Sequence, residues 1–173
     1  TIVMSNDIIN TNSDGTEITA AFQRVKKTDM HLNLDIRETR VLKNLHDLIV
    51  DYSLTDRVTL TGIEVFQANK VKENCPGVEY YVNYMPSRIN IFTEDYQQKI
   101  IDMLEKTGAI GINCNYKYAS RTLSNLLHKN GYKLSIWTVD GKYQIKRALV
   151  NTADNITTNN PQKVQHIINK WGK

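Results

Sequence analysis

The sequence has no apolar run that approaches the roughly 18 residues required for a membrane-spanning helix. No basic segment followed by an apolar one opens the chain, so we expect no signal peptide in it. Cytoplasmic, membrane-associated and extracellular locations all stay open. Cysteine is scarce, with Cys75 and Cys114 far apart among 173 residues. Two such residues are too few for a disulfide scaffold and wrongly spaced for zinc, so we expect buried thiols that pack as small apolar groups.

Clustered charge is also missing, although the net charge is +4 and the isoelectric point is near 9.0. The 22 basic residues are spread along the chain. Nucleic-acid binding calls for a basic stripe or a known module, so we expect no nucleic-acid partner. A positive net charge is compatible with anionic substrates. The sequence also lacks a Walker loop, a GxGxxG turn, an HExxH motif and a Ser–His–Asp order.

What the sequence does contain, from residue 29 onward, is an alternation of short β-rich runs with amphipathic segments. The runs start roughly 20 to 30 residues apart, which is the spacing of successive strand-plus-crossover-helix units. The predicted strands are 30–36, 57–61, 78–84, 109–113, 132–139 and 155–158. Helical periodicity indicates helices near 41–52, 93–108, 123–130 and 161–171, and a further helix from about residue 142.

Alternating strands and helices with short connections predict an α/β fold with a parallel sheet. We expect an incomplete TIM-type (β/α) barrel of about six strands with crossover helices, because a complete eight-stranded barrel usually takes about 250 residues. Residues 1–173 should form one domain, since no repeat or linker divides them. A short strand at 1–4 and a helix at 17–27 suggest an edge hairpin or excursion. An incomplete barrel exposes strand edges and apolar faces, so we expect an oligomer or a further N-terminal segment to complete it.

The strongest candidate site lies at the end of the first regular strand, where Asn33, Asp35 and Arg37 alternate and therefore point to one side. The Asp35 carboxylate offers hard oxygen ligands for magnesium or calcium. The Arg37 guanidinium offers a fork for phosphate oxygens. The alternative is an Asp35–Arg37 ion pair that only closes the strand end, and such pairs are common and unspecific.

Polar residues also follow the last two predicted strands. Trp137 could form an apolar wall for a ligand or serve as a core aromatic, and Asp140 could cap the helix that follows it. Thr158 and Asn159 could donate hydrogen bonds to a phosphate near a helix N-terminus. Equally, they could end the strand and cap the helix that starts at Pro161. None of the four histidines is placed as a general acid or base at the mouth of the predicted barrel.

Two pieces of the chain, Trp-Thr-Val-Asp at 137–140 and Ile-Thr-Thr-Asn-Asn-Pro at 156–161, together resemble the C-terminal signature of the glycerophosphodiester phosphodiesterase family. Residues 2–10 resemble the family's Val-Val-x-His-Asp-x-x-Leu segment, and residues 31–38 resemble its Ile-Glu-Ile-Lys strand. Residues 58–63 resemble the next strand. The stretches 109–115, 134–140 and 155–161 resemble the sixth, seventh and eighth strands.

The resemblance implies a phospholipase C-like (βα)8 barrel that hydrolyses glycerophosphodiesters to glycerol phosphate and an alcohol. It further implies a divalent cation, magnesium or calcium, held by carboxylates, and two histidines acting as acid and base. Asp35 stands at the position of a family Glu and Arg37 at that of a family Lys. With a glycerophosphodiester as substrate, the candidate substrate-binding residues are Arg37, Trp137, Thr158 and Asn159.

The chain departs from the family pattern at its N-terminal end. It lacks the His-Arg-Gly and Glu-x-Asp motifs, and Ser5 stands at the position of a catalytic histidine, whose proton transfer a serine cannot perform near neutral pH. Two interpretations stay open. The chain is the rear portion of a hydrolase whose missing elements are supplied elsewhere, or it is a non-catalytic glycerophosphate-binding or assembly module derived from that family. Ser5 favours the second.

Overall fold

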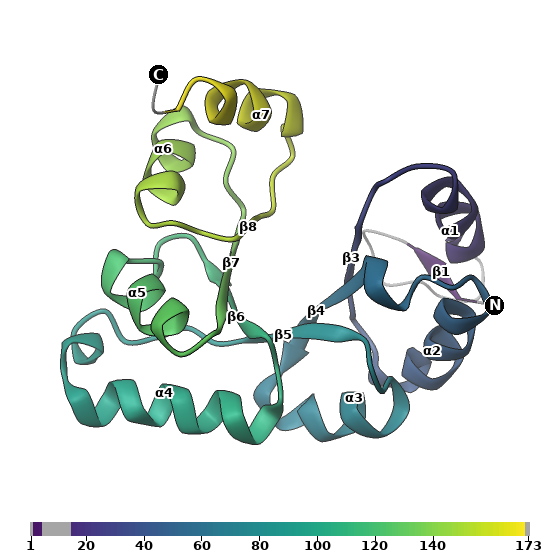
Figure 1. The fold of residues 1–173 in the computed structure, drawn as a ribbon, viewed down its shortest axis with the longest axis horizontal. Coiled ribbons are helices and arrows are strands. Elements are labelled where there is room, and N and C mark those ends of the chain that lie inside the picture. The colour runs from purple at the N-terminus through teal and green to yellow at the C-terminus, as the bar shows by residue number, and fades with distance from the viewer. Residues whose placement is uncertain (1, 5–14, 172–173) are drawn as a thin grey trace.

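The computed structural model describes residues 2–4 and 15–171 and contains a parallel six-stranded sheet that curls into part of a barrel (Figure 1). The strand order is β3-β4-β5-β6-β7-β8, so each strand pairs with the strand that follows it along the chain. The strands are β3 (Leu32–Asp35), β4 (Val58–Glu64), β5 (Glu79–Asn83), β6 (Gly111–Asn115), β7 (Lys133–Trp137) and β8 (Asn155–Ile156). The predicted α/β fold with an incomplete TIM-type barrel is confirmed.

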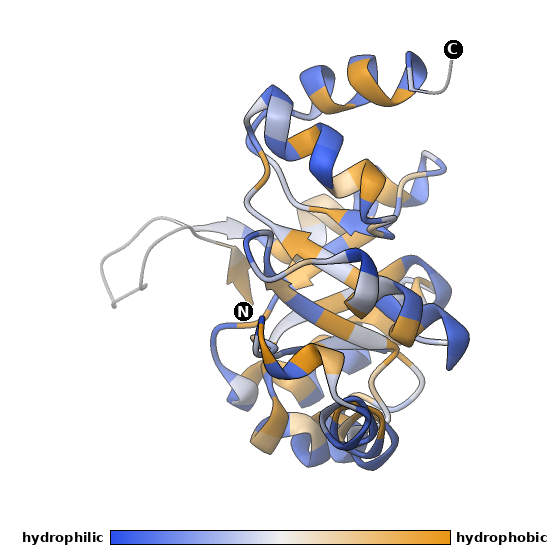
Figure 2. Cartoon of the chain, turned by 90° about the vertical axis from the view of Figure 1, so that its left-hand side faces the viewer, coloured by the Kyte–Doolittle hydropathy of each residue, from blue (hydrophilic) through white to orange (hydrophobic). Residues whose placement is uncertain are grey.

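Helices connect successive strands on the outside of the arc (Figure 1). Figure 2 shows hydrophobic and hydrophilic residues alternating along these helices, as expected for helices with one buried face. One helix, Ala68–Asn74, was not predicted. The helices are α1 (Ile18–Lys26), α2 (Leu42–Asp51), α3 (Ala68–Asn74), α4 (Glu94–Thr107), α5 (Arg121–Lys129), α6 (Lys142–Val150) and α7 (Pro161–Asn169).

The two faces of the sheet differ in chemistry because side chains alternate along each strand. On the face toward the helices, Leu34 lies in register with Leu60, and Ile112 lies in register with Leu134. All four side chains are buried in the core. The opposite, concave face is rich in hydroxyl and amide side chains, and several of these are also buried. The helices therefore hold the sheet through apolar contacts, while the concave face presents polar groups.

The sheet ends at β3 on one side and at β8 on the other, and the two strands do not pair with each other within the described residues. Before β3 the chain forms a separate antiparallel pair, β1 (Val3–Met4) with β2 (Thr16–Glu17), which confirms the expected edge hairpin. That a partner chain or further segment covers the edges of the sheet stays a prediction. Among the described residues, no helix combines the length and the apolar character needed to cross a bilayer.

The ends of α4 and α7 agree only in part with the sequence signals. Helix α4 ends at Gly108, which has the left-handed φ of 71° expected from a C-terminal glycine. Asn160, and not the predicted Thr158 or Asn159, caps α7 by accepting a hydrogen bond from the Lys163 N–H at 3.2 Å. Thr93 precedes α4 as predicted, but its hydroxyl donates to the Asn90 carbonyl and makes no cap. Both cysteines are buried, and burial raises the pKa of Cys114 to about 12.

Candidate functional site

A cleft of about 1010 Å³ lies at the carboxyl ends of the strands. In parallel α/β barrels this is the end at which ligands bind. Four of the predicted site residues line the cleft: Asn33 and Asp35 in β3, Arg37 just after it, and Trp137 at the end of β7. The peptide bond between Trp137 and Thr138 is cis. Polar lining residues that the sequence did not single out come from β4, β5 and β6: Glu64, Asn83 and Asn113.

At one corner of this cleft, β3 and β4 end side by side. We call Asp35, Arg37, Gly62 and Glu64 the front corner. The Arg37 Nε atom lies 2.8 Å from the Asp35 Oδ2 atom, and the side chains are 81% and 48% exposed, respectively. Arg37 has no other hydrogen-bond partner among the described residues. Its two terminal nitrogens therefore stay available for an anion that enters the cleft.

Gly62 permits the close approach of the two strands at the front corner. It has a φ of +77°, and a Cβ atom there would lie 2.6 Å from both the Asp35 Oδ1 atom and the Ile36 carbonyl oxygen. The register of β4 against β5 shifts between Leu60 and Ile63, on either side of this glycine. Such irregularities re-aim side chains next to binding sites. A side chain at position 62 would displace the Asp35 carboxylate.

A line of five hydrogen-bonded side chains crosses the concave face from β8 to β4, and we call it the polar row. Asn155 donates to Ser135 at 2.9 Å, Ser135 donates to Asn113 at 2.9 Å, and Asn113 donates to Asn83 at 3.0 Å. Asn83 completes the row by donating to Glu64 Oε1 at 2.9 Å. Consecutive members are register partners on neighbouring strands. Because every bond points toward the Glu64 carboxylate, the row polarises its members in one direction.

Tyr84, which follows β5, lines the cleft beside the polar row. Its hydroxyl lies 3.0 Å from the Tyr96 hydroxyl, which also accepts a hydrogen bond from the Ser87 N–H at 2.8 Å. Burial, reinforced by the hydrogen bond with Tyr96, raises the pKa of Tyr84 to about 12. Tyr84 is therefore protonated near neutral pH.

The rear corner, made by Asp140, Thr158, Asn159 and Lys163, lies where β7 and β8 end. The Asp140 Oδ1 atom accepts from the Thr158 hydroxyl at 2.9 Å and from the Asn159 N–H at 2.8 Å. Its Oδ2 atom accepts from the Asn159 side chain at 2.9 Å, and Lys163 donates to the Asp140 carbonyl at 2.8 Å. The Asn159 side-chain and backbone donors, followed by Thr158, lower the pKa of Asp140. The groups predicted to donate to a phosphate thus donate to a carboxylate here.

Asp140 does not cap the next helix, which was one interpretation of its position. Gly141 is the residue that precedes α6, and the Gln144 side chain accepts from the backbone N–H groups of Asp140 and Gly141. The Asp140 carboxylate instead ties β7 to the segment after β8. Thr158 and Asn159 lie outside the cleft lining, whereas their neighbour Thr157 lines it.

No histidine of the described chain lines the cleft. His31 bonds Thr59 at the amino end of β3, and His128 bonds Asp154. Ser5, the position of the family histidine, lies outside the described residues. No group of three or more histidine, cysteine or acidic side chains within residues 2–4 and 15–171 is arranged to hold a metal ion.

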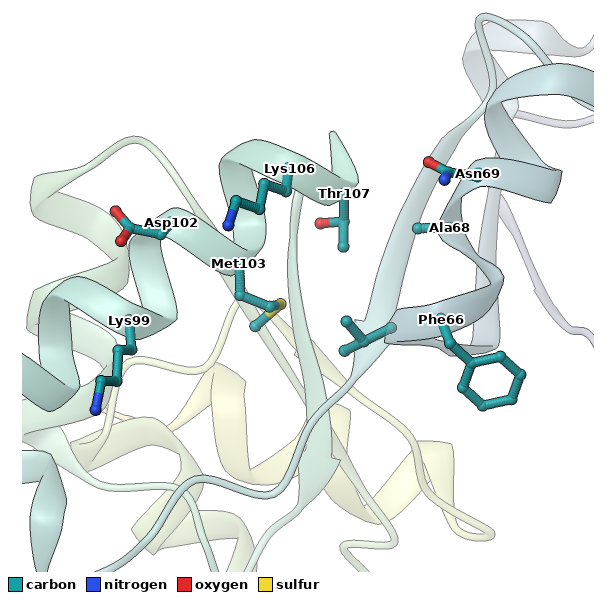
Figure 3. A pocket seen from close by; sticks show the side chains of 9 residues that line it. Phe66, Ala68, Asn69, Lys99, Asp102, Met103, Lys106 and Thr107 are labelled. Carbon is teal, nitrogen blue, oxygen red and sulfur yellow. The ribbon is translucent and has the colours of Figure 1, made fainter.

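A second hollow of about 430 Å³ lies between α3 and α4, on the outside of the sheet (Figure 3). Charged side chains of α4, namely Lys99, Asp102 and Lys106, line it together with Ala68 and Asn69 of α3. Mixed charges on a single helix provide no convergent set of groups for one ligand. The candidate site is therefore the cleft at the strand ends.

Comparison with known proteins shows which family the chain resembles. No family model matches the sequence. A glycerophosphodiester phosphodiesterase from Caldanaerobacter subterraneus subsp. tengcongensis is 23% identical over 156 residues, which are 87% of this chain and 60% of that protein. The chain thus spans about 60% of the length of the curated relative that it matches.

Solved structures share the fold. A protein from Galdieria sulphuraria assigned as a glycerophosphodiester phosphodiesterase superposes with a TM-score of 0.73 at 16% identity, covering 95% of this chain and 68% of that one. A phosphodiesterase from Oleispira antarctica, in complex with its product sn-glycerol-3-phosphate, gives a TM-score of 0.63 at 16% identity and covers 86% and 59%. The chain resembles the glycerophosphodiester phosphodiesterases in sequence and in fold, which confirms the resemblance inferred from the sequence.

Proposed function

We propose that this chain binds the glycerophosphate part of a glycerophosphodiester in the cleft at the strand ends. The observation that carries the proposal is that Asp35 and Arg37 line this cleft together, with Trp137 in the same lining. A guanidinium binds phosphate oxygens, a carboxylate binds a divalent cation, and an indole provides an apolar surface for a glycerol carbon chain. The sn-glycerol-3-phosphate complex of the Oleispira antarctica phosphodiesterase supports this ligand class.

Arg37 is suited to the phosphate because its ion pair with Asp35 uses the Nε atom. The terminal nitrogens of the guanidinium can then take two phosphate oxygens in the planar, forked geometry that arginine favours. Asp35 would at the same time hold the guanidinium plane in place. The Asp35–Arg37 ion pair, which the sequence also predicted as an alternative to a binding site, is therefore compatible with ligand binding.

A divalent cation fits the donor set at the front corner. Asp35 and Glu64 bring two carboxylates to the cleft, and magnesium is commonly bound through one or two carboxylates, several waters and substrate phosphate oxygens. When bound, the cation would neutralise phosphate charge. The residues that would hold it are Asp35 and Glu64, and the polar row already orients Glu64 through Asn83.

Hydrolysis of the diester, to glycerol phosphate and an alcohol, is the activity we infer from the family. It requires a base that activates water and an acid that protonates the leaving alcohol. The second candidate function is a non-catalytic glycerophosphate-binding module. The absence of a histidine from the cleft lining of the described chain favours this alternative. Release of choline from sn-glycero-3-phosphocholine by the purified chain, with magnesium or calcium, would decide for the hydrolase.

Calorimetric titration with sn-glycerol-3-phosphate tests binding separately from hydrolysis. We expect binding that magnesium or calcium strengthens, and the Arg37→Ala variant should bind about tenfold to hundredfold more weakly because it loses charge-assisted hydrogen bonds. Asp35→Asn should chiefly remove the cation dependence. Arg40→Ala is the matched control, since Arg40 is equally exposed and paired with Glu38 but does not line the cleft. Equal affinities for the Arg37→Ala and Arg40→Ala variants would disprove the proposal.

A further inference from the structure

Exposed apolar side chains collect at the same end of the molecule as the cleft. Six of the eleven large hydrophobic residues that are exposed in the described structure lie in or just after the loops that leave the strands at their carboxyl ends. Isolated exposed apolar residues are ordinary, but a group at one end marks an interaction surface. The six residues are Phe66, Met85, Ile89, Phe92, Tyr118 and Tyr143.

The most exposed part of this group is the loop between β5 and α4. Ile89 is 81% exposed and Phe92 is 69% exposed, and Ile91 between them is buried and fixes the short helical turn of Asn90–Phe92. Thr93 then donates its N–H to the Asn90 carbonyl at 2.9 Å. Ile89 and Phe92 are thus presented to solvent from a loop with its own internal contacts.

Basic side chains lie directly beside these apolar ones. A groove of about 180 Å³ runs between the β5–α4 loop, the β6–α5 loop and α6, and Arg88, Lys117 and Arg147 line it together with Phe92 and Tyr118. No acidic residue lines this groove. None of the three cations forms an ion pair with another residue in the part of the chain that the structure describes. The groove is therefore a small positive hollow with an aromatic border.

This groove and the cleft lie on two sides of one loop. Met85 lines the cleft, and the residues that follow it, Pro86, Ser87 and Arg88, line the groove. Any flat surface that rests on Ile89 and Phe92 would consequently lie close to the mouth of the cleft.

We propose that the loops 85–92 and 117–118 form a docking surface for an anionic phospholipid bilayer. In this arrangement the side chains of Ile89 and Phe92 enter the interfacial region, and a lipid headgroup phosphate occupies the groove of Arg88, Lys117 and Arg147. Aromatic and aliphatic side chains flanked by lysine and arginine are the combination that peripheral proteins use at such interfaces. A protein partner would be expected to satisfy an exposed cation group with its own acidic side chains, whereas a headgroup phosphate fits a hollow of this size.

Docking does not depend on hydrolysis or on glycerophosphate binding in the cleft, so its test is separate from theirs. The measurement is cosedimentation with vesicles of phosphatidylcholine alone and of phosphatidylcholine mixed with phosphatidylglycerol, at low and at high salt. We expect the chain to bind the anionic vesicles, to bind the neutral ones much more weakly, and to lose binding as salt rises.

Two variants test the two parts of the surface. Arg88→Gln/Lys117→Gln should lower the partition onto anionic vesicles by about twenty-fivefold, since each basic residue near such a surface contributes about fivefold. Ile89→Ser/Phe92→Ser should lower it by about tenfold, through loss of interfacial burial. The control for the charge variant is Lys27→Gln/Lys129→Gln, which removes the same charge from exposed positions at the C-terminal ends of α1 and α5. The control for the apolar variant is Met30→Ser, which removes an exposed apolar side chain before β3. Both controls should bind nearly as well as the parent chain.

Circular-dichroism melting of each variant shows whether it is folded. The proposal is overturned if the parent chain binds no anionic vesicles at low salt, or if the groove and loop variants lose no more binding than their controls. It is also overturned if Ile89→Ser/Phe92→Ser abolishes a concentration-dependent self-association while no vesicle binding is seen, because the surface would then belong to a second copy of this chain.

Discussion

The front corner of the cleft and the rear corner, whose four residues lie outside the cleft lining, use similar residues in opposite ways. At the front corner, one exposed carboxylate and one exposed guanidinium share a single ion pair, and the guanidinium keeps free nitrogens. At the rear corner, the Asp140 carboxylate accepts three hydrogen bonds from Thr158 and Asn159. The front corner is therefore open to a ligand, whereas the rear corner is occupied by its own side chains. The sequence pattern alone could not distinguish them, because polar residues follow a strand in both.

The largest loss of stability should come from a substitution that fills the space at the front corner. Gly62→Ala places a methyl group 2.6 Å from the Asp35 carboxylate and the Ile36 carbonyl, on a backbone with positive φ. We expect a loss of unfolding free energy of roughly 3–5 kcal/mol, of which the left-handed backbone contributes about 1–2 kcal/mol. Urea unfolding followed by circular dichroism measures it.

Gly77→Ala is the control for this substitution. Gly77 has nearly the same φ, +78°, but its nearest neighbour to a new Cβ atom is the Thr55 methyl group at 3.9 Å. We expect only the backbone contribution of about 1–2 kcal/mol. Equal losses in the two variants would show that the close approach at the front corner has no energetic role.

A smaller effect should follow from interrupting the polar row that joins β4 at the front corner to β8 near the rear corner. Asn113→Ala leaves Asn83 and Ser135 without their shared partner on a buried part of the concave face. Loss of two such bonds should reduce the unfolding free energy by about 2–4 kcal/mol. The exposed Asn69→Ala, on α3, should change it by less than about 0.5 kcal/mol.

The Asn113→Ala variant also tests whether the polar row affects ligand binding at the front corner. If the row orients Glu64 for a cation, Asn113→Ala should also weaken the magnesium dependence of sn-glycerol-3-phosphate binding. Unchanged magnesium dependence, in a variant that remains folded, would show that the two corners act independently.

The smallest change in the free energy of unfolding should follow from a substitution at the rear corner, and this change should depend on pH. Because the folded state lowers the pKa of Asp140 below its ordinary value of 3.8, ionised Asp140 stabilises the fold above that value. This stabilisation is lost as pH falls through the lowered folded pKa. Asp140→Asn should therefore be less stable than the parent chain near neutral pH, and the difference should shrink below about pH 4.

Urea unfolding of Asp140→Asn at several pH values measures this difference. The exposed Asp29→Asn serves as the control. A difference between the parent chain and Asp140→Asn that stays constant with pH would contradict the role assigned to the carboxylate.

Periodicity predicted most of the fold, because strand and helix signals were local. The six strands were found within a few residues of their bounds, and Gly108 marks the end of α4 as expected. Helix α3 was missed because its sequence, Ala-Asn-Lys-Val-Lys-Glu-Asn, has only two residues that are buried, Ala68 and Val71. Such a short and polar segment gives almost no apolar stripe.

The site was predicted less completely. Asp35, Arg37 and Trp137 all line the cleft, as expected for residues at the same end of the barrel. Their roles in binding stay predictions. The polar row was missed because its five residues come from five strands, and only the register of the sheet brings them together. A signal was nevertheless present: Asn113 and Ser135 each interrupt an otherwise apolar strand core, and a buried polar side chain needs a partner.

The sequential strand order also affects how the chain can fold. Each strand pairs with the one that precedes it along the chain, and β3 and β8 meet no strand on their outer edges among the described residues. Every new strand can therefore dock as soon as its crossover helix has formed, without waiting for a distant segment, which keeps loop-closure entropy small. A sheet built in this way can assemble progressively from its N-terminal side while the chain is still being synthesised.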